Sequence, residues 1–305
     1  MEKPAELPAR ALEWIASAAP RAVAHVAPIG GGITNTKWLV TLVDGSRLVM
    51  RWEDPVVWGR LGREHVHREA LACRVLSASG LPVPTLIAGD VDGTSTDGSA
   101  NLMTWRPGRT RLDPLGPGAI TELARVVVAL HRRPVAHSQE LPVFTLRRAI
   151  DPAVPGWARW PHLWRRALDL TATAPPPPPC GLLHGDLHLG NLLWRDDEVT
   201  GLIDWAETSW GPPDVDVAHL CSDFAMMHSA LDAERFRSAY LRAGGRLDPD
   251  PDAARFWMIS DIIGFLPDPA HILPAVHVHR PDITADQVRQ RLEQLLQVTL
   301  VGPAA

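Results

Sequence analysis

The stretch His184-Gly185-Asp186-Leu187-His188-Leu189-Gly190-Asn191, with Asp204 a little downstream, decides the fold of this chain. Apolar runs at 182–183 and 192–194 flank it, and after a turn-prone segment comes Gly201-Leu202-Ile203-Asp204-Trp205. Short apolar runs separated by turn residues predict a strand, a tight loop, a strand, a turn and a strand. Polar side chains are therefore expected in the loop and at the end of the last strand.

Three of these polar residues are the groups that a phosphoryl-transfer site needs. Asp186 would orient an attacking hydroxyl and take its proton, while the Asn191 amide oxygen and the Asp204 carboxylate would hold Mg²⁺ against a triphosphate. An aspartate, an asparagine five residues later and a second aspartate on a later strand follow one another in the same order in protein kinases. An isolated His-Gly-Asp would indicate an ordinary hairpin loop, but the complete set favours a phosphotransferase.

The motifs His184-Gly185-Asp186 and Ile203-Asp204-Trp205 resemble those of the aminoglycoside phosphotransferase family, kinase-like enzymes that phosphorylate hydroxyls of small molecules. The resemblance implies an α+β, two-lobed, protein-kinase-like fold. A small β-rich N-terminal lobe (residues 1–106) would bind the nucleotide, and a larger, mainly helical C-terminal lobe (107–305) would carry catalysis and substrate binding. ATP or GTP and Mg²⁺ are the implied cofactors.

A glycine-rich segment lies between two predicted strands, 22–29 and 37–43. Glycine lets backbone N–H groups approach phosphates closely, because no Cβ blocks them. A plain hairpin turn is the alternative reading, but the position ahead of the catalytic motif favours a phosphate-covering loop. The residues expected to bind nucleotide there are Gly31, Gly32, Thr34 and Asn35.

Kinase-like folds place a phosphate-binding lysine on the third strand, paired with a glutamate on the next helix. Here the third predicted strand, 47–52, carries Arg51 at that position, and Glu69 in the predicted helix 60–78 is its natural partner. An arginine fork suits a bidentate pair with a carboxylate. Lys37 on the preceding strand is an alternative phosphate contact, and the sequence does not decide between Lys37 and Arg51.

The resemblance also implies a hinge near residue 105. Backbone groups near Thr104 and Arg106 would bind the purine edge, with Met103 behind it. Four later segments predict helices, at 217–230, 232–243, 252–265 and 284–300.

Supporting roles are expected for several residues of the C-terminal lobe. By resemblance, Asp216 would support the catalytic loop through backbone hydrogen bonds, with Asp214 as the N-cap of the following helix. His131, at the end of an apolar helix (117–132), is expected to pack or cap, and His184 to stabilise the loop. His188 lies inside the loop without an assigned role.

Composition limits the remaining classes of function. The 305 residues are 46% hydrophobic and 21% charged, which is ordinary for a globular protein. A net charge of −5 argues against a nucleic-acid partner, and no apolar stretch approaches the roughly 20 residues of a membrane span. The start of the sequence lacks the pattern of a signal peptide. The three cysteines lack CxxC spacing and predict reduced thiols in a cytoplasmic protein. A monomer or homodimer is expected.

The substrate is predicted to be a small hydroxylated molecule, because no peptide-docking segment separates Asp204 from Asp216. An antibiotic (an aminoglycoside, a macrolide or another natural product) is the first interpretation. A metabolic kinase acting on choline, homoserine or a sugar is the alternative, and a nucleotide-binding pseudokinase is the third. A metal site at His271, His277 and His279 is disfavoured, because no cysteine or carboxylate lies at ligand spacing.

Overall fold

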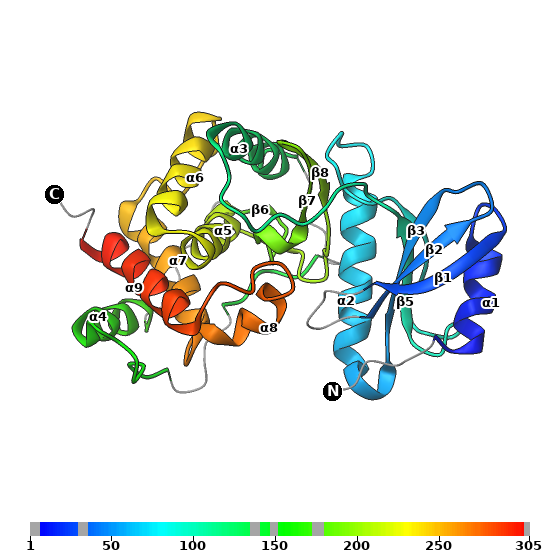
Figure 1. The fold of residues 1–305 in the computed structure, drawn as a ribbon, viewed down its shortest axis with the longest axis horizontal. Helices are drawn as coiled ribbons and strands as arrows, with labels where there is room; N and C mark the ends of the chain where they lie inside the picture. Colours follow the sequence, from blue (N-terminus) through cyan, green and yellow to red (C-terminus); the bar gives the residue numbers. More distant parts are fainter. Residues whose placement is uncertain (1–6, 30–35, 135–140, 147–151, 173–179, 302–305) are drawn as a thin grey trace. The chain divides into compact units, whose positions relative to one another are not determined.

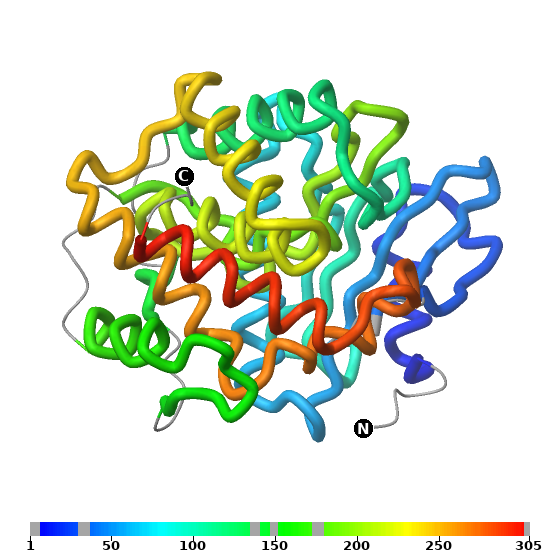
Figure 2. The backbone as a smooth tube through the Cα atoms, turned by 60° about the vertical axis from the view of Figure 1, so that its left-hand side comes forward, coloured from blue at the N-terminus to red at the C-terminus, as the bar shows by residue number. Residues whose placement is uncertain are grey.

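The chain divides into two compact units. The first comprises Met1–Gly108 and Thr200–Thr208, and the second comprises Arg109–Val199 and Ser209–Ala305. Figures 1 and 2 show the computed structural model, which describes residues 7–29, 36–134, 141–146, 152–172 and 180–301. The segment 200–208 therefore belongs to the first unit although it lies far along the sequence. The predicted glycine loop, 30–35, lies outside the described residues.

The first unit contains a five-stranded antiparallel sheet with strand order β1-β2-β3-β5-β4 (Figure 1). An Asp44-Gly45 turn joins the second and third strands; Gly45 has a φ of 80°, which glycine adopts without strain. The strands are β1 (Val23–Ile29), β2 (Thr36–Leu42), β3 (Arg47–Glu53), β4 (Leu86–Asp90) and β5 (Ser99–Thr104).

The two helices of the first unit, α1 (Ala9–Ala18) and α2 (Pro55–Leu76), lie on opposite faces of the sheet (Figure 1). Side chains alternate between the two faces along a strand. In β3, Leu48, Met50 and Trp52 join the apolar core with Ala11 and Ile15 of α1. The other face of β3 looks toward α2 and carries Arg51 and Glu53, so a buried charged layer lies between sheet and helix.

Helix α2 is longer than the sequence predicts. It begins at Pro55, with Asp54 as N-cap, and turns sharply at Gly59, whose φ of 49° and ψ of −126° are not helical. The regular part of the helix follows this kink and agrees with the predicted 60–78. Asn101 of β5 joins the sheet to this helix, because its Nδ2 donates to Val66 O at 2.8 Å.

The second unit is mainly helical and contains a two-stranded sheet of β6 and β9, while β7 pairs with β8 in another two-stranded sheet. The chain passes from the second unit to the first within β8. The strands are β6 (Gly181–Leu183), β7 (Leu192–Arg195), β8 (Glu198–Leu202) and β9 (Ser209–Gly211). The helices are α3 (Pro117–His131), α4 (Pro161–Thr171), α5 (Pro213–Met227), α6 (Ala230–Arg242), α7 (Pro251–Gly264), α8 (Leu273–Val276) and α9 (Ala285–Val301).

Helix α5 is the centre of the second unit and packs against α6, α7, α9 and β6 (Figure 2). Between Asp214 and Met227 every residue of α5 is buried except His219, which is partly exposed. A helix that is buried on all sides belongs to a core. The helix begins four residues before the predicted 217, and the predicted role of Asp214 as N-cap is wrong. Pro212 is the N-cap, and the Asp214 carboxylate instead accepts from Asp248 N at 3.1 Å.

The α+β class predicted from the sequence is confirmed by the antiparallel N-terminal sheet and the helical C-terminal part. Within the described ranges, no helix is both long and apolar enough to cross a bilayer. Cys73 and Cys221 are buried free thiols. The described residues contain no cluster of three or more histidine, cysteine, aspartate or glutamate side chains that would hold a metal.

Candidate active site

The loop that carries Asp186 lies between β6 and β7 and is held by side chains of α5. The Asp216 carboxylate accepts from His184 N at 2.8 Å and from Gly185 N at 2.9 Å. Gly185 has a φ of 84°, so glycine relieves strain at this turn. The supporting role predicted for Asp216 is confirmed. His131 packs as predicted, with its Nε2 at 3.2 Å from Asp216 Oδ2 and its Nδ1 at 2.8 Å from Tyr240 Oη.

The end of the loop is a single 3₁₀ turn, Leu189–Asn191. His188 caps this turn, because its Nδ1 accepts from Gly190 N at 3.1 Å. The Asp223 carboxylate of α5 accepts from Leu189 N at 2.7 Å. The loop backbone is thus anchored to one helix at both ends, by Asp216 and by Asp223.

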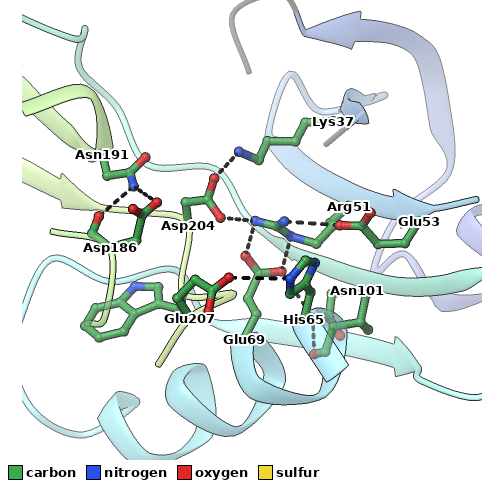
Figure 3. A network of polar contacts seen from close by, with 12 residues as sticks. Lys37, Arg51, Glu53, His65, Glu69, Asn101, Asp186, Asn191, Asp204 and Glu207 are labelled. Atoms are coloured by element: carbon green, nitrogen blue, oxygen red, sulfur yellow. Dashed lines mark hydrogen bonds and ion pairs between the residues drawn. The ribbon is translucent and has the colours of Figure 1, made fainter. Parts of the chain in front are cut away.

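Asp186 and Asn191 are in direct contact. Asn191 Nδ2 donates to Asp186 O at 2.9 Å and to Asp186 Oδ2 at 3.2 Å (Figure 3). The Asn191 side chain is therefore oriented with its nitrogen toward Asp186, which leaves its Oδ1 as the atom suited to a cation. Asp186 keeps 41% of its side chain exposed. It is a partly exposed carboxylate on a loop whose Leu187, Leu189 and Asn191 are buried.

His219 of α5 approaches the other carboxylate oxygen of Asp186. Its Nε2 lies 3.5 Å from Asp186 Oδ1, and its Nδ1 lies 2.9 Å from Asp261 Oδ1 of α7. The ring stacks on Phe265 with centroids 5.9 Å apart and planes 4° apart. Burial opposes the charged imidazole, but Asp261 and Asp186 outweigh it and raise the pKa of His219 well above its ordinary value.

In the first unit, Arg51 is fully buried and binds three carboxylates (Figure 3). Its Nε and Nη2 form the predicted bidentate pair with Glu69, at 2.8 and 2.9 Å. Its Nη1 lies 3.3 Å from Glu53 Oε1, and its Nη2 also donates to Asp204 Oδ1 at 2.6 Å. Each guanidinium nitrogen of Arg51 thus has a carboxylate partner.

Lys37 lies opposite Arg51 in the β2–β3 register. Its Nζ donates to the other oxygen of Asp204, Oδ2, at 2.7 Å. Burial alone would raise the pKa of Asp204, but Arg51 and Lys37 outweigh it and hold that pKa well below its ordinary value. Asp204 is therefore a carboxylate anion at physiological pH. It lies two residues after the end of β8 and has a φ of 67°.

The residues predicted to line the purine are also in the first unit. Met103 is buried and its sulfur lies 3.8 Å from Cys73 Sγ. The backbone N–H of Thr104 already donates to Thr85 O at 2.9 Å. This N–H is therefore not available to bind the edge of a purine. The Arg106 side chain donates from Nε to Thr200 O at 2.9 Å. The predicted glycine-loop residues Gly31, Gly32, Thr34 and Asn35 lie outside the part of the chain that the structure describes.

The donor set suits Mg²⁺ rather than a softer metal. Asn191 offers an amide oxygen and Asp204 an ionised carboxylate, both hard oxygen ligands. Each of the two residues thus carries an oxygen of the kind that Mg²⁺ prefers.

Sequence comparison decides the family. Residues 25–257 match the pattern of the phosphotransferase enzyme family, APH. The chain belongs to this family. The match includes parts of both units and contains Arg51, Asp186, Asn191 and Asp204.

Solved structures of other phosphotransferases have the same fold. A thermostable mutant of aminoglycoside phosphotransferase APH(4)-Ia, in ternary complex with AMP-PNP and hygromycin B, aligns with a TM-score of 0.61, 16% identity and coverage of 97% of this chain and 100% of that one. Macrolide 2'-phosphotransferase MphH from Brachybacterium faecium aligns with a TM-score of 0.53, 17% identity and coverage of 97% and 99%. Amicoumacin kinase hAmiN, in complex with AMP-PNP, Ca²⁺ and Ami, aligns with a TM-score of 0.57, 14% identity and coverage of 92% and 90%.

Two curated proteins are related in sequence. A probable acyl-CoA dehydrogenase, IBR3 of Arabidopsis thaliana, is 25% identical over 257 residues, which are 72% of this chain and 30% of that protein. Acyl-CoA dehydrogenase family member 10 of Mus musculus is 26% identical over 209 residues, 62% of this chain and 19% of that protein. The chain thus spans less than a third of the length of these curated relatives.

Sequence reasoning missed four charged or titratable groups of the candidate site: Glu53, His219, Asp223 and Asp261. A signal for two of them was present. His219 and Asp223 follow Asp216 at spacings of three and seven residues in a helix that is otherwise almost apolar. Residues at these spacings share one helix face. A polar stripe on an apolar helix indicates a buried polar contact, and here the stripe faces the catalytic loop.

Proposed function

We propose that this protein is a nucleotide- and Mg²⁺-dependent O-phosphotransferase that moves the γ-phosphate to a hydroxyl of a small molecule. One observation carries the proposal. In a chain of the phosphotransferase family, Asp186 is an accessible carboxylate whose loop is anchored by Asp216 and whose Oδ2 is held by Asn191. This is the arrangement that a base for an attacking hydroxyl requires: a fixed position and access to solvent.

The chemistry follows from these residues. The acceptor hydroxyl donates its hydrogen to Asp186, which aligns the oxygen with the γ-phosphorus and takes the proton. A bond forms between the acceptor oxygen and the γ-phosphorus as the bond from that phosphorus to the β,γ-bridging oxygen breaks, and the nucleoside diphosphate leaves. Because the transferring phosphoryl group is loosely bonded in the transition state, catalysis depends mainly on positioning and charge stabilisation.

Asn191 and Asp204 would hold the metal in this proposal. Mg²⁺ bound by their oxygens would neutralise charge on the phosphates. The Arg51–Glu69 pair keeps the Asp204 segment in place through Nη2 of Arg51. The AMP-PNP complexes of the structurally similar APH(4)-Ia and hAmiN support ATP as the donor.

An antibiotic is the acceptor we propose first. The structural neighbours named above include phosphotransferases of aminoglycosides, macrolides and amicoumacin. A metabolic small-molecule kinase is the second candidate. The curated relatives found by sequence carry names of metabolic enzymes, acyl-CoA dehydrogenases of a plant and a mouse, rather than of antibiotic phosphotransferases. The pseudokinase alternative is disfavoured, since Asp186, Asn191 and Asp204 are all present.

The test is phosphate transfer from [γ-³²P]ATP or GTP to a panel of hydroxylated antibiotics and metabolites, with and without Mg²⁺. Asp186→Asn should abolish transfer to the acceptor found while nucleotide affinity, measured by calorimetry, stays within about threefold. Asp169→Asn is the matched control, because Asp169 is exposed on α4. Full transfer by Asp186→Asn, or no transfer by the wild type to any acceptor or to water, would contradict the proposal.

A further inference from the structure

The helix α5 places a histidine between two carboxylates at the catalytic loop. His219 Nε2 lies 3.5 Å from Asp186 Oδ1, and His219 Nδ1 lies 2.9 Å from Asp261 Oδ1. An imidazole that carries a proton on both nitrogens donates to both carboxylates. The three side chains therefore form a chain of charges, Asp261–His219–Asp186, within the second unit.

The orientation of the His219 ring is restricted on several sides. Phe265 stacks on it with a 4° angle between the ring planes, and His188 meets it edge-on with centroids 6.1 Å apart. Asp261 holds its Nδ1. A ring with these contacts cannot rotate without losing at least one of them, so its Nε2 points in a fixed direction, toward Asp186.

Packing alone does not account for this arrangement. The Oδ2 atom of Asp261 is buried and, among the described residues, has no hydrogen-bond partner. A buried carboxylate with an unsatisfied oxygen destabilises a fold, and a buried ion pair is often replaced by apolar residues without loss of stability. His219 is also the partly exposed residue of an otherwise buried stretch of α5.

We propose that His219, held by Asp261, is a positioning residue that fixes the carboxylate of Asp186 for attack by the acceptor hydroxyl. Asn191 holds Oδ2 of Asp186 at 3.2 Å, and His219 restrains the other oxygen, Oδ1, at 3.5 Å. With both oxygens restrained, the carboxylate plane is fixed. This inference rests on the proposed phosphotransferase function. It adds to that site two positioning residues, His219 and Asp261, that lie outside the His184-Gly185-Asp186 motif.

The first measurement is structural and needs no substrate. The imidazole ¹⁵N resonances of His219, assigned by their loss in His219→Gln, should show a ring protonated on both nitrogens at neutral pH. They should shift in both Asp186→Asn and Asp261→Asn, and remain unchanged in Asp169→Asn. A His219 ring that does not respond to Asp186→Asn would overturn the inference, because the contact would then be absent in solution.

The second measurement is catalytic. The reaction measured is transfer to the acceptor that the panel identifies, or phosphate release from Mg-ATP into water. His219→Ala should lower kcat roughly 10- to 100-fold and change the KM for ATP by less than about threefold, which is typical when a supporting partner of a catalytic group is removed. Asp261→Ala should have a similar effect. The double variant should lose no more than His219→Ala alone, because the two residues act as one unit. His162→Ala, exposed on α4, is the matched control.

The pH profile separates positioning from packing. Asp186, His188 and Asp261 face His219, and Asp223 lies one turn further along α5. In Asp261→Asn the imidazole of His219 loses a neighbouring negative charge, so the ring should lose a proton as the pH rises through neutrality. The kcat of this variant should fall over the same range, whereas the kcat of the wild type should not. His219→Gln should keep part of the activity without that pH dependence.

The outcomes are distinguishable. An active wild type whose kcat and pH profile are unchanged in folded His219 and Asp261 variants overturns this inference and leaves the proposed function intact. A wild type that transfers phosphate to nothing, water included, overturns both. Circular dichroism confirms that each variant is folded, and Asp261→Asn preserves the shape of the side chain if the alanine variants do not fold.

Discussion

Lys37 and Arg51 lie opposite each other on β2 and β3 and donate to different oxygens of one carboxylate, that of Asp204. Their surroundings differ: the side chain of Arg51 is 0% exposed and that of Lys37 is 21% exposed. A fully buried cation with three carboxylate partners holds the structure together, whereas a partly exposed one can still meet a ligand. The two cations therefore have different expected effects when removed.

Lys37→Met should weaken nucleotide binding while the fold persists. The variant removes the accessible cation beside Asp204, and we expect the Kd for Mg-ATP to rise about tenfold or more, because an ionic hydrogen bond to phosphate contributes roughly 1.5–3 kcal/mol. Calorimetric titration measures the affinity. Arg166→Met, exposed on α4, is the matched loss of a surface cation and should bind nucleotide normally. Unchanged affinity in Lys37→Met would assign phosphate binding elsewhere.

Arg51→Met should destabilise the first unit, and this effect should outweigh any effect on nucleotide binding. It leaves Glu69, Glu53 and Asp204 without their shared cation, and removing one partner of a buried ion pair typically costs about 3–5 kcal/mol. Urea denaturation measures the loss. Arg51→Lys should be intermediate, since lysine keeps the charge but cannot form the bidentate pair with Glu69. A fully stable Arg51→Met would contradict the network.

Glu53→Gln should stabilise the protein in a pH-dependent way. Burial raises the pKa of Glu53 to about 7, and Arg51 offsets this only in part. A carboxyl whose folded pKa lies above its unfolded value of 4.5 lowers stability progressively as pH rises from 4.5 to about 7, and by a constant amount above. The variant should therefore gain roughly 3 kcal/mol at pH 8 and little near pH 4.5. Urea midpoints at both pH values test this; an equal gain at both would refute it.

Asp216→Asn should impair both the catalytic loop and the stability at neutral pH. Burial raises the pKa of Asp216, but His131, His184 and the Gly185 N–H outweigh it and lower that pKa. A lowered folded pKa gives stability that is present above the unfolded value of 3.8 and is lost as pH falls through the folded value. The difference in unfolding free energy between wild type and variant should thus be largest near neutrality and should shrink in acid. Thermal melts at several pH values provide the check.

Much of the fold follows from patterns in the sequence. The strands 22–29, 37–43 and 47–52 have clear turn signals between them, and β1, β2 and β3 form at those places. The Arg51–Glu69 pair was predicted because kinase-like folds pair a cation on the third strand with a glutamate on the next helix, and Arg51 and Glu69 stand at those positions.

Long-range contacts were harder to predict. Asp261 lies 42 residues beyond His219, and no local pattern joins α5 to α7. The start of α2 was misplaced because a positive φ at Gly59 interrupts the helical pattern. Asp214 was assigned as an N-cap because aspartate favours that position, but a tertiary contact with Asp248 determines its role instead.

The inclusion of residues 200–208 in the first unit has a consequence for synthesis on the ribosome. Leu202 N donates to Pro82 O at 2.8 Å, and Asp204 supplies the third carboxylate of Arg51. After residue 108 is translated, roughly a hundred further residues must be translated before this unit is complete. This order differs from the usual one, in which N-terminal domains fold first. Until Asp204 emerges, Arg51 lacks its third carboxylate partner, so the first unit is completed only late in synthesis.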